Sequence, residues 1–218
     1  MNILDEMHRV FELEIATLVE ARDALNSSYT EAAKLLFDCT GKVVVTGAGK
    51  SGLIAQKIAA TMVSTGTPSV FLHPGDGMHG DVGIIQERDV LLAISKSGET
   101  EELSNLLLYV KKVDVPIISI TANPESTLGK SSNLVLFTQV AKEACPLNLA
   151  PTSSTTVALV VGDALAMALM KMRGFEPENF AVLHPGGQLG KRLLLTVADI
   201  MRSGENNPVL GVTGTVRN

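Results

Sequence analysis

LLAISKSGETEE, residues 91–102, decides the fold of this chain: an apolar run typical of a buried strand ends at a cluster of hydroxyls and a glycine, and acids that can open a helix follow. At such a turn the free backbone N–H groups and the positive end of the helix dipole favour an anion. An ordinary capped strand-to-helix turn uses the same residue types. A second turn of this kind, VVVTGAGKSG at residues 43–52, favours the anion site over that alternative.

Short apolar, β-branched runs alternate with helical patterns along the chain. Strands are expected at residues 42–46, 69–72, 90–95, 115–120 and 133–137. Helices are expected at residues 3–25, after Ser27 and Ser28, at 53–63, 101–112, 125–130 and from Thr152 to Arg173. This pattern predicts an α/β fold, a doubly wound five-stranded parallel sheet of order 2-1-3-4-5 flanked by helices. In that order strands 1 and 3 are neighbours, so both turns lie at one crevice where ligands bind.

Composition limits the classes of protein that the chain can represent. With 218 residues, 45% of them hydrophobic and 19% charged, it suits one compact domain, expected at residues 1–200 with a polar tail at 201–218. A net charge of −5 without a basic cluster argues against nucleic-acid binding. Asp5 and Glu6 stand where a signal peptide would be basic, and two cysteines fit a reducing cytosol, so a cytoplasmic location is expected. The charge-free stretch 144–162 contains two prolines and is not expected to span a membrane.

The turn GAGKSG also matches the dinucleotide-binding pattern G-x-G-x-x-G. That pattern expects an acid at the end of the second strand, where it holds the ribose hydroxyls. His73 and Pro74 occupy this place, so the sequence favours a phosphate site over a nicotinamide or flavin site. The turn is not a Walker A loop either, because Val44 stands where that motif requires a glycine.

These motifs resemble the sugar isomerase (SIS) domain family, whose mark is a Ser-x-Ser-Gly-Glu-Thr phosphate loop after a central strand. Within that family GKVVVTGAGKSG, STGTPSVFLHPGDGMHGDVG, AKEACPLNLAPTSSTT, GDALA and HPGGQLGKRLL look like the arabinose 5-phosphate isomerases. The likeness extends from about Glu31 to Met201. Many relatives carry a C-terminal pair of CBS modules, whereas this chain stops just after VADIM, so it resembles either a single-domain form or a shortened piece of a longer protein.

The resemblance implies an aldose-ketose isomerase that interconverts D-ribulose 5-phosphate and D-arabinose 5-phosphate through an enediol, with no cofactor. The product would enter Kdo synthesis, for lipopolysaccharide or for capsule. Two alternatives stay open: a non-catalytic domain that senses a sugar phosphate, and another SIS phosphosugar isomerase. The long amphipathic N-terminal helix has more apolar surface than one sheet edge needs, and His184 lies on a late glycine loop, so a homotetramer is expected, a dimer of dimers with shared active sites.

Hydroxyls at the two turns are the expected phosphate ligands. Ser95, Ser97 and Thr100 would hold the phosphate, and Ser51 could add a hydroxyl from the neighbouring turn. At the start of the long helix, Thr152 or Ser153 could reach the substrate.

The resemblance aligns five further residues with the polar residues of the isomerase active site, and each has a structural alternative. They are Lys50, His79, Glu102, Glu143 and His184. Lys50 could meet negative charge or be a solvated loop lysine, and Glu102 could order the site or only oppose a helix dipole.

Glu143 is the expected proton shuttle between C1 and C2, with a pKa raised by desolvation among apolar neighbours. Its alternative is a loop acid paired with Lys142 or a backbone amide. For His184, contributed by a neighbouring subunit in related isomerases, the expected role is opening the furanose ring or moving the oxygen-bound protons, and the alternative is a plain surface histidine. His79 could orient sugar hydroxyls. The spacing of histidines and acids around it matches no zinc signature, so no catalytic metal is expected.

Overall fold

The computed structural model describes residues 2–186, 196–202 and 204. The chain divides into two compact units, Met1–Phe175 and Glu176–Asn218. The expected tail, residues 201–218, lies mostly outside the described residues, and the expected domain boundary at residue 200 stays a prediction. The second unit contains the short helices α8 (Pro177–Leu183) and α10 (Val197–Ile200).

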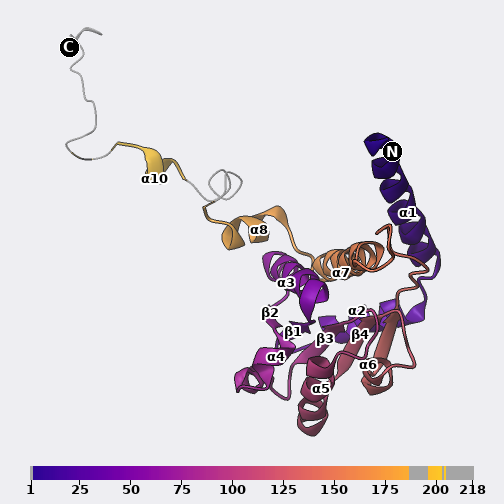
Figure 1. The fold of residues 1–218 in the computed structure, drawn as a ribbon. Helices are drawn as coiled ribbons and strands as arrows, with labels where there is room; N and C mark the ends of the chain where they lie inside the picture. Colours follow the sequence, from indigo (N-terminus) through magenta and orange to yellow (C-terminus); the bar gives the residue numbers. More distant parts are fainter. Residues whose placement is uncertain (1, 187–195, 203, 205–218) are drawn as a thin grey trace. The chain divides into compact units, whose positions relative to one another are not determined.

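The first unit is built on a five-stranded parallel sheet (Figure 1). Its strands are β1 (Val43–Thr46), β2 (Ser69–Leu72), β3 (Val90–Ile94), β4 (Ile117–Thr121) and β5 (Leu134–Phe137). Their order is β2-β1-β3-β4-β5, and all four neighbouring pairs are parallel. The predicted fold class is therefore confirmed, strand for strand.

Both faces of the sheet are covered by helices, because its apolar side chains alternate between two cores. Val43, Val45 and Leu92 belong to the first core. Val44 and Leu91 belong to the second. The first core also receives side chains from α1 (Ile3–Asp23), α2 (Ser27–Phe37), α3 (Gly49–Ser64) and α7 (Ser153–Met172). The second receives them from α5 (Glu101–Val113) and α6 (Thr127–Ser131), close to the short helices α4 (Pro74–Gly77) and η1 (Asp81–Ile84).

The crossovers after β1 and β3 therefore leave on opposite faces of the sheet. The helix after β1, α3, packs in the first core, and the helix after β3, α5, packs in the second. Since β1 and β3 are adjacent, their carboxyl ends form the switch point of the doubly wound sheet. The crevice expected from the sequence is at this place.

One helix differs from the sequence expectation in a way that matters for the site. The helix α3 begins at Gly49, four residues earlier than predicted, so the GAGKSG turn is partly helical.

The helix α7 is long and apolar enough to cross a membrane, yet half of its most apolar window is buried inside the protein. It packs on α3, α1 and α2, as a core helix does.

Candidate functional site

The turn after β3 folds its own hydroxyls onto its backbone. Ser95 Oγ accepts a hydrogen bond from Gly98 N (3.1 Å) and lies 3.4 Å from Thr100 Oγ1. Ser97 Oγ accepts one from Glu99 N (3.3 Å). Gly98 has a φ of +70°, a left-handed conformation that glycine adopts without strain. Three hydroxyls are thus gathered directly before α5, where the helix dipole favours an anion.

Contacts from the β4–α6 segment hold this turn in place. The Glu99 carboxylate accepts hydrogen bonds from Thr127 N (2.9 Å) and Thr127 Oγ1 (2.7 Å). The carbonyl oxygen of Gly98 accepts one from Leu128 N (3.1 Å). A Cβ on Gly98 would collide with Ser126 Oγ, so only glycine fits there. The turn is therefore ordered before any ligand binds.

The turn after β1 touches the turn after β3. A Cβ on Gly47 would lie 2.9 Å from the carbonyl oxygen of Ile94, the residue before Ser95. A Cβ on Gly52 would lie 2.6 Å from Gly47 O, and Gly49 has a φ of +57°. The glycines of GAGKSG are thus required by the packing of α3 on the sheet, which accounts for the G-x-G-x-x-G match without a dinucleotide.

The two polar residues expected from the GAGKSG turn are placed in the first turn of α3. Lys50 is exposed there, and Ser51 is partly buried. Their roles toward a phosphate stay predictions.

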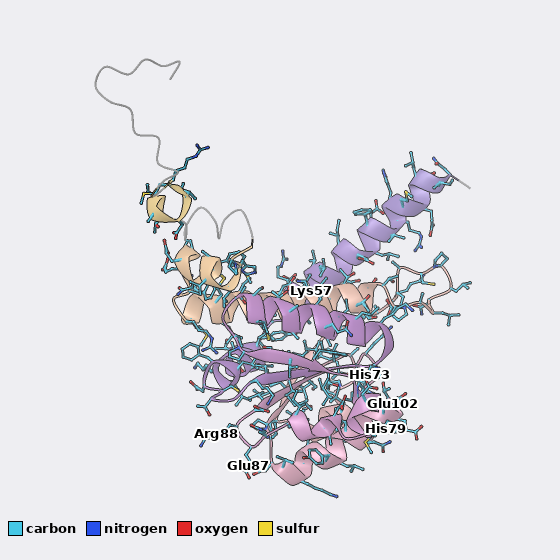
Figure 2. The ribbon with its side chains drawn as sticks, turned by 90° about the vertical axis from the view of Figure 1, so that its left-hand side faces the viewer. Lys57, His73, His79, Glu87, Arg88 and Glu102 are labelled. Atoms are coloured by element: carbon cyan, nitrogen blue, oxygen red, sulfur yellow. The ribbon has the colours of Figure 1, made fainter. Side chains whose placement is uncertain are left out.

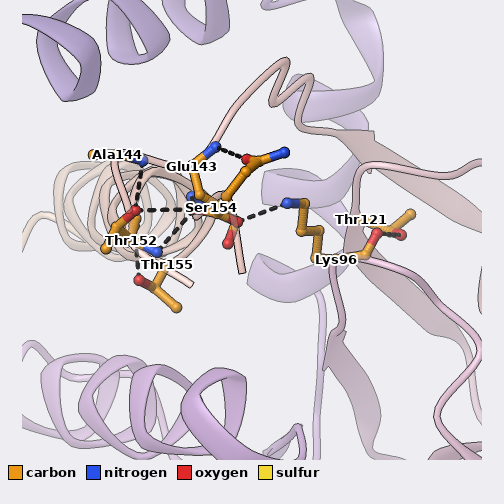
Figure 3. Close-up of polar contacts among 8 residues, drawn as sticks. Lys96, Thr121, Glu143, Ala144, Thr152, Ser154 and Thr155 are labelled. Atoms are coloured by element: carbon orange, nitrogen blue, oxygen red, sulfur yellow. Dashed lines mark hydrogen bonds and ion pairs between the residues drawn. The ribbon is translucent and has the colours of Figure 1, made fainter. Parts of the chain in front are cut away.

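Glu143 lies between β5 and α7, and its side chain is only 2% exposed (Figure 3). Its Oε2 accepts hydrogen bonds from Thr152 N (2.8 Å), Thr152 Oγ1 (3.1 Å) and Ser154 N (3.2 Å). Its Oε1 accepts one from Lys96 Nζ (2.6 Å). The carboxylate therefore caps the N-terminus of α7 on one side and contacts the loop after β3 on the other.

The expected direction of the Glu143 pKa is wrong. Burial alone would raise this pKa, but hydrogen bonds from Lys96, Ser154 and the backbone N–H of Thr152 outweigh it and lower the pKa to about 2. The apolar neighbours in the sequence suggested desolvation, and they gave no sign of the donors that the fold places around the carboxylate. Of the alternative partners, backbone amides are observed, those of Thr152 and Ser154, whereas the ion pair is with Lys96 and not with Lys142.

Lys96 is the residue that sequence reasoning missed. It stands inside the SKSGET motif, but Glu143 is 47 residues further along the chain. No spacing rule connects two loops that meet only because β3 and β5 belong to one sheet. The sequence signal that could have identified Lys96 was its position between Ser95 and Ser97, two expected phosphate ligands.

Thr152 and Ser153 start α7 in two different environments. The Thr152 hydroxyl is already committed, because its oxygen accepts a hydrogen bond from Ala144 N (2.8 Å) and it contacts Glu143 Oε2. The Ser153 hydroxyl is fully buried and has no hydrogen-bond partner among the described residues. A substrate contact from either residue stays a prediction.

His79 and Glu102 lie on the same side of the first unit as His73 (Figure 2). Both His79 and Glu102 are exposed. The Nδ1 of His73 is already occupied, because it accepts a hydrogen bond from Gly75 N (3.2 Å). Within the described residues, no three His, Cys, Asp or Glu side chains are grouped as a metal site requires.

His184 belongs to the second unit, directly after α8. Its ring stacks on Phe180 with 3.8 Å between centroids, and its Nδ1 lies 2.9 Å from the carbonyl oxygen of Phe180. The ring is therefore held by its own helix. Its expected role at a site shared between subunits stays a prediction.

Comparisons with known proteins match this fold and sequence to one family. The SIS domain family matches residues 35–168. The arabinose 5-phosphate isomerase KdsD of Salmonella typhi is 51% identical over 208 residues, which are 95% of this chain and 63% of that protein, and KdsD of Escherichia coli K12 gives the same figures. The chain thus spans less than two thirds of the length of these curated relatives. A solved structure of the E. coli CFT073 protein c3406 in complex with arabinose 5-phosphate is 42% identical, with a TM-score of 0.81, and covers 85% of this chain and 100% of that one.

Proposed function

The chain belongs to the SIS domain family, and we propose that it is an isomerase that interconverts D-ribulose 5-phosphate and D-arabinose 5-phosphate. One observation carries this reading: a buried, ionised carboxylate, Glu143, contacts the hydroxyl-rich loop after β3 through Lys96 Nζ at 2.6 Å. A phosphate site and a proton acceptor are thus neighbours in one crevice. The names of the similar relatives, KdsD, support the choice of sugar.

Phosphate binding is assigned to the loop that precedes α5. The hydroxyls of Ser95, Ser97 and Thr100 can donate to phosphate oxygens, and the N-terminus of α5 adds its dipole. Ser51 lies in the adjacent turn, and Lys50 is exposed beside it. Because such contacts are the same before and during the reaction, they set affinity more than the chemical rate.

Proton transfer between C1 and C2 is assigned to Glu143. Its carboxylate removes the proton from one carbon and leaves a planar enediolate; a proton then moves between O1 and O2, and the carboxylic acid returns its proton to the other carbon. Arabinose rather than ribose forms when the proton reaches C2 on one face, and a carboxylate fixed by the N-terminus of α7 delivers it from one direction. The reaction is redox-neutral, so it calls for no nicotinamide or flavin.

Three further residues are proposed to act on the oxygens of the sugar: His184, His79 and Glu102. The aldose closes through O4 and has to be opened, and His184 is the proposed acid–base group for that step. The proposed role of His79 is to orient the sugar hydroxyls, and that of Glu102 is to order the loop from the first turn of α5.

A coupled assay tests the proposed activity. Ribulose 5-phosphate and arabinose 5-phosphate should interconvert, while ribose, heptose and hexulose phosphates should turn over at least about a hundredfold more slowly. Turnover of another phosphosugar would move the chain to a different SIS isomerase. Binding of these sugars without any turnover would favour the sensor alternative.

A homotetramer, a dimer of dimers in the cytoplasm, is the proposed assembly. The helix α1 carries large apolar side chains that are more than half exposed: Ile3, Leu4, Met7, Phe11 and Ile15. Beside it lies an apolar groove of about 540 Å³ between α1, α2 and α7. A second copy of the chain would bury both surfaces. Mixing inactive Glu143→Gln and His184→Ala proteins should restore activity if the sites are shared; no recovery after proven subunit exchange would contradict this.

A further inference from the structure

Lys96 is anchored by its backbone, and its ammonium group pairs with Glu143. The carbonyl oxygen of Lys96 accepts hydrogen bonds from Ala122 N (3.1 Å) and Thr121 Oγ1 (3.2 Å). Its side chain is 43% exposed and crosses to Glu143 (Figure 3). A lysine head on a flexible four-carbon stem can change partners without moving the loop that carries it.

The two oxygens of Glu143 are not equivalent. Oε2 accepts three hydrogen bonds from the start of α7, where Thr152 and Ser154 donate. Oε1 accepts one, from Lys96 Nζ, in the part of the chain that the structure describes. A carboxylate oxygen that already accepts three donors has no lone pair left for a substrate proton. The oxygen that can react is therefore Oε1, and Lys96 occupies it.

Two charged groups of α1 that lie near this loop have other partners. The guanidinium of Arg9 bonds to the carbonyl oxygen of Ala144 (2.6 Å) and to the Glu6 carboxylate. Glu14, also on α1, accepts a hydrogen bond from Thr156 Oγ1 (2.8 Å). Neither group contacts Oε1. The charge next to the reacting oxygen is that of Lys96.

Lys96 also stands between two of the assigned phosphate ligands, Ser95 and Ser97. A phosphate dianion bound by this loop would compete with the single charge of Glu143 for the same ammonium group. We infer that Lys96 is a positioning residue that exchanges between two anions, the Glu143 carboxylate and the phosphate of the substrate, so that phosphate binding frees Oε1 to accept the proton. This inference rests on the proposed function and adds to it a link between phosphate recognition and the proton acceptor.

The link has a measurable consequence in binding alone. If phosphate has to draw Lys96 away from Glu143, removing the Glu143 charge strengthens phosphate binding in two ways: it ends a direct repulsion, and it releases the lysine. When Lys96 is absent, only the repulsion ends. The gain from Glu143→Gln should therefore depend on Lys96, whereas a lysine fixed in one place would give equal gains.

The experiment is a double-mutant cycle of inorganic phosphate binding, measured by calorimetry at about pH 8, where phosphate is a dianion and Glu143 is ionised. Wild type, Glu143→Gln, Lys96→Met and the double variant are compared. Glu143→Gln should tighten binding about tenfold in the wild-type background and about threefold or less in the Lys96→Met background. Lys96→Arg, which keeps the charge, should restore most of the difference.

Two controls locate the effect. Ser97→Ala should weaken phosphate binding, which places the ion in the loop after β3. Lys42→Met breaks a second lysine–carboxylate pair with a buried acid, Lys42 with Asp89, and should leave phosphate affinity within about twofold of wild type.

Three results would each overturn the inference. They are equal gains in phosphate affinity in the two backgrounds, no gain from Glu143→Gln, and no phosphate binding by wild type. The coupled assay decides the proposed function separately. Isomerase turnover without coupling would leave that function intact and remove the role of Lys96. Coupling without turnover of the pentose phosphates would keep the role of Lys96 and reject the sugar.

Discussion

Two buried carboxylates, Asp89 and Glu143, each form an ion pair with a lysine, and they lie at opposite ends of the sheet. Asp89 precedes β3, next to Glu87 and Arg88, which Figure 2 shows well away from His73 and Glu102. It pairs with Lys42 at 2.7 Å. Glu143 follows β5 and pairs with Lys96 at 2.6 Å. Residue types and burial are alike, so these features alone do not distinguish a structural pair from a functional one.

The two carboxylates differ in the hydrogen bonds that their oxygens accept besides the ion pair with lysine. Both oxygens of Asp89 accept hydrogen bonds from backbone N–H groups, those of Lys42 (2.9 Å) and Gln86 (2.9 Å), and a Cβ on Gly41 would collide with Oδ1. The chain itself therefore closes around both oxygens of Asp89. Glu143 has such bonds on Oε2 alone, and its Oε1 meets only the half-exposed Lys96 within the described residues. A carboxylate with one oxygen held by a movable group is suited to chemistry.

The largest expected effect separates the two carboxylates by rate and by stability. Glu143→Gln keeps the shape but cannot take a proton, so kcat should fall by about 10²–10⁴ with both substrates. Asp89→Asn leaves Lys42 without its counter-charge and should lower the free energy of unfolding by about 3 kcal/mol. Steady-state kinetics and denaturant unfolding check the pair of variants.

The distinction between Asp89 and Glu143 would be contradicted if the loss of kcat were found in the Asp89 variant and not in the Glu143 variant. A kcat per folded molecule reduced about a hundredfold in Asp89→Asn, or retained in Glu143→Gln, would show that the pairing pattern does not identify the reacting group.

The acid stability of the protein sharpens the comparison through the pKa of Glu143. This pKa is lowered from an ordinary 4.5 to about 2, so between these values the unfolded chain binds more protons than the folded one. The stabilisation is present above about pH 4.5 and is lost as the pH falls through 2, at most about 3 kcal/mol. In Glu143→Gln the unfolding free energy should fall less steeply between about pH 5 and pH 2.

Asp89 should supply the remaining slope, because its pKa is also lowered: burial opposes the shift, and the hydrogen bonds from Lys42 and Gln86 prevail. Chemical denaturation at several pH values measures both. Identical slopes for wild type and Glu143→Gln would show that the carboxylate is not held ionised by its partners.

The smallest expected effect lies in the phosphate loop. Ser97→Ala removes one hydroxyl that binds the ground state and the transition state alike, so KM should rise about tenfold while kcat changes less. Initial-rate kinetics with ribulose 5-phosphate tests this. An unchanged KM would place the phosphate outside the loop after β3.

The sequence was sufficient for the scaffold but not for the contacts of the reacting group. Apolar runs predicted every strand, and the hydroxyls after β3 marked one side of the crevice, because these signals are local in the chain. The state of Glu143 was not local: its donors come from Lys96, 47 residues earlier, and from the first turn of α7. Its pKa direction was therefore wrong. Lys50 and Ser51 were expected in a turn, whereas α3 already begins at Gly49.

The most direct test of the proposed chemistry is the isomerisation of ribulose 5-phosphate in D₂O, followed by NMR of the product. A carboxylate such as Glu143 exchanges its proton with solvent, so we expect arabinose 5-phosphate with deuterium at C2, formed without NAD(P) and without added metal. Glu143→Gln should slow formation of both the product and the label by the same factor as kcat, about 10²–10⁴. Product without deuterium whose formation requires NAD(P), or label incorporation that Glu143→Gln leaves intact, would contradict proton transfer by this carboxylate.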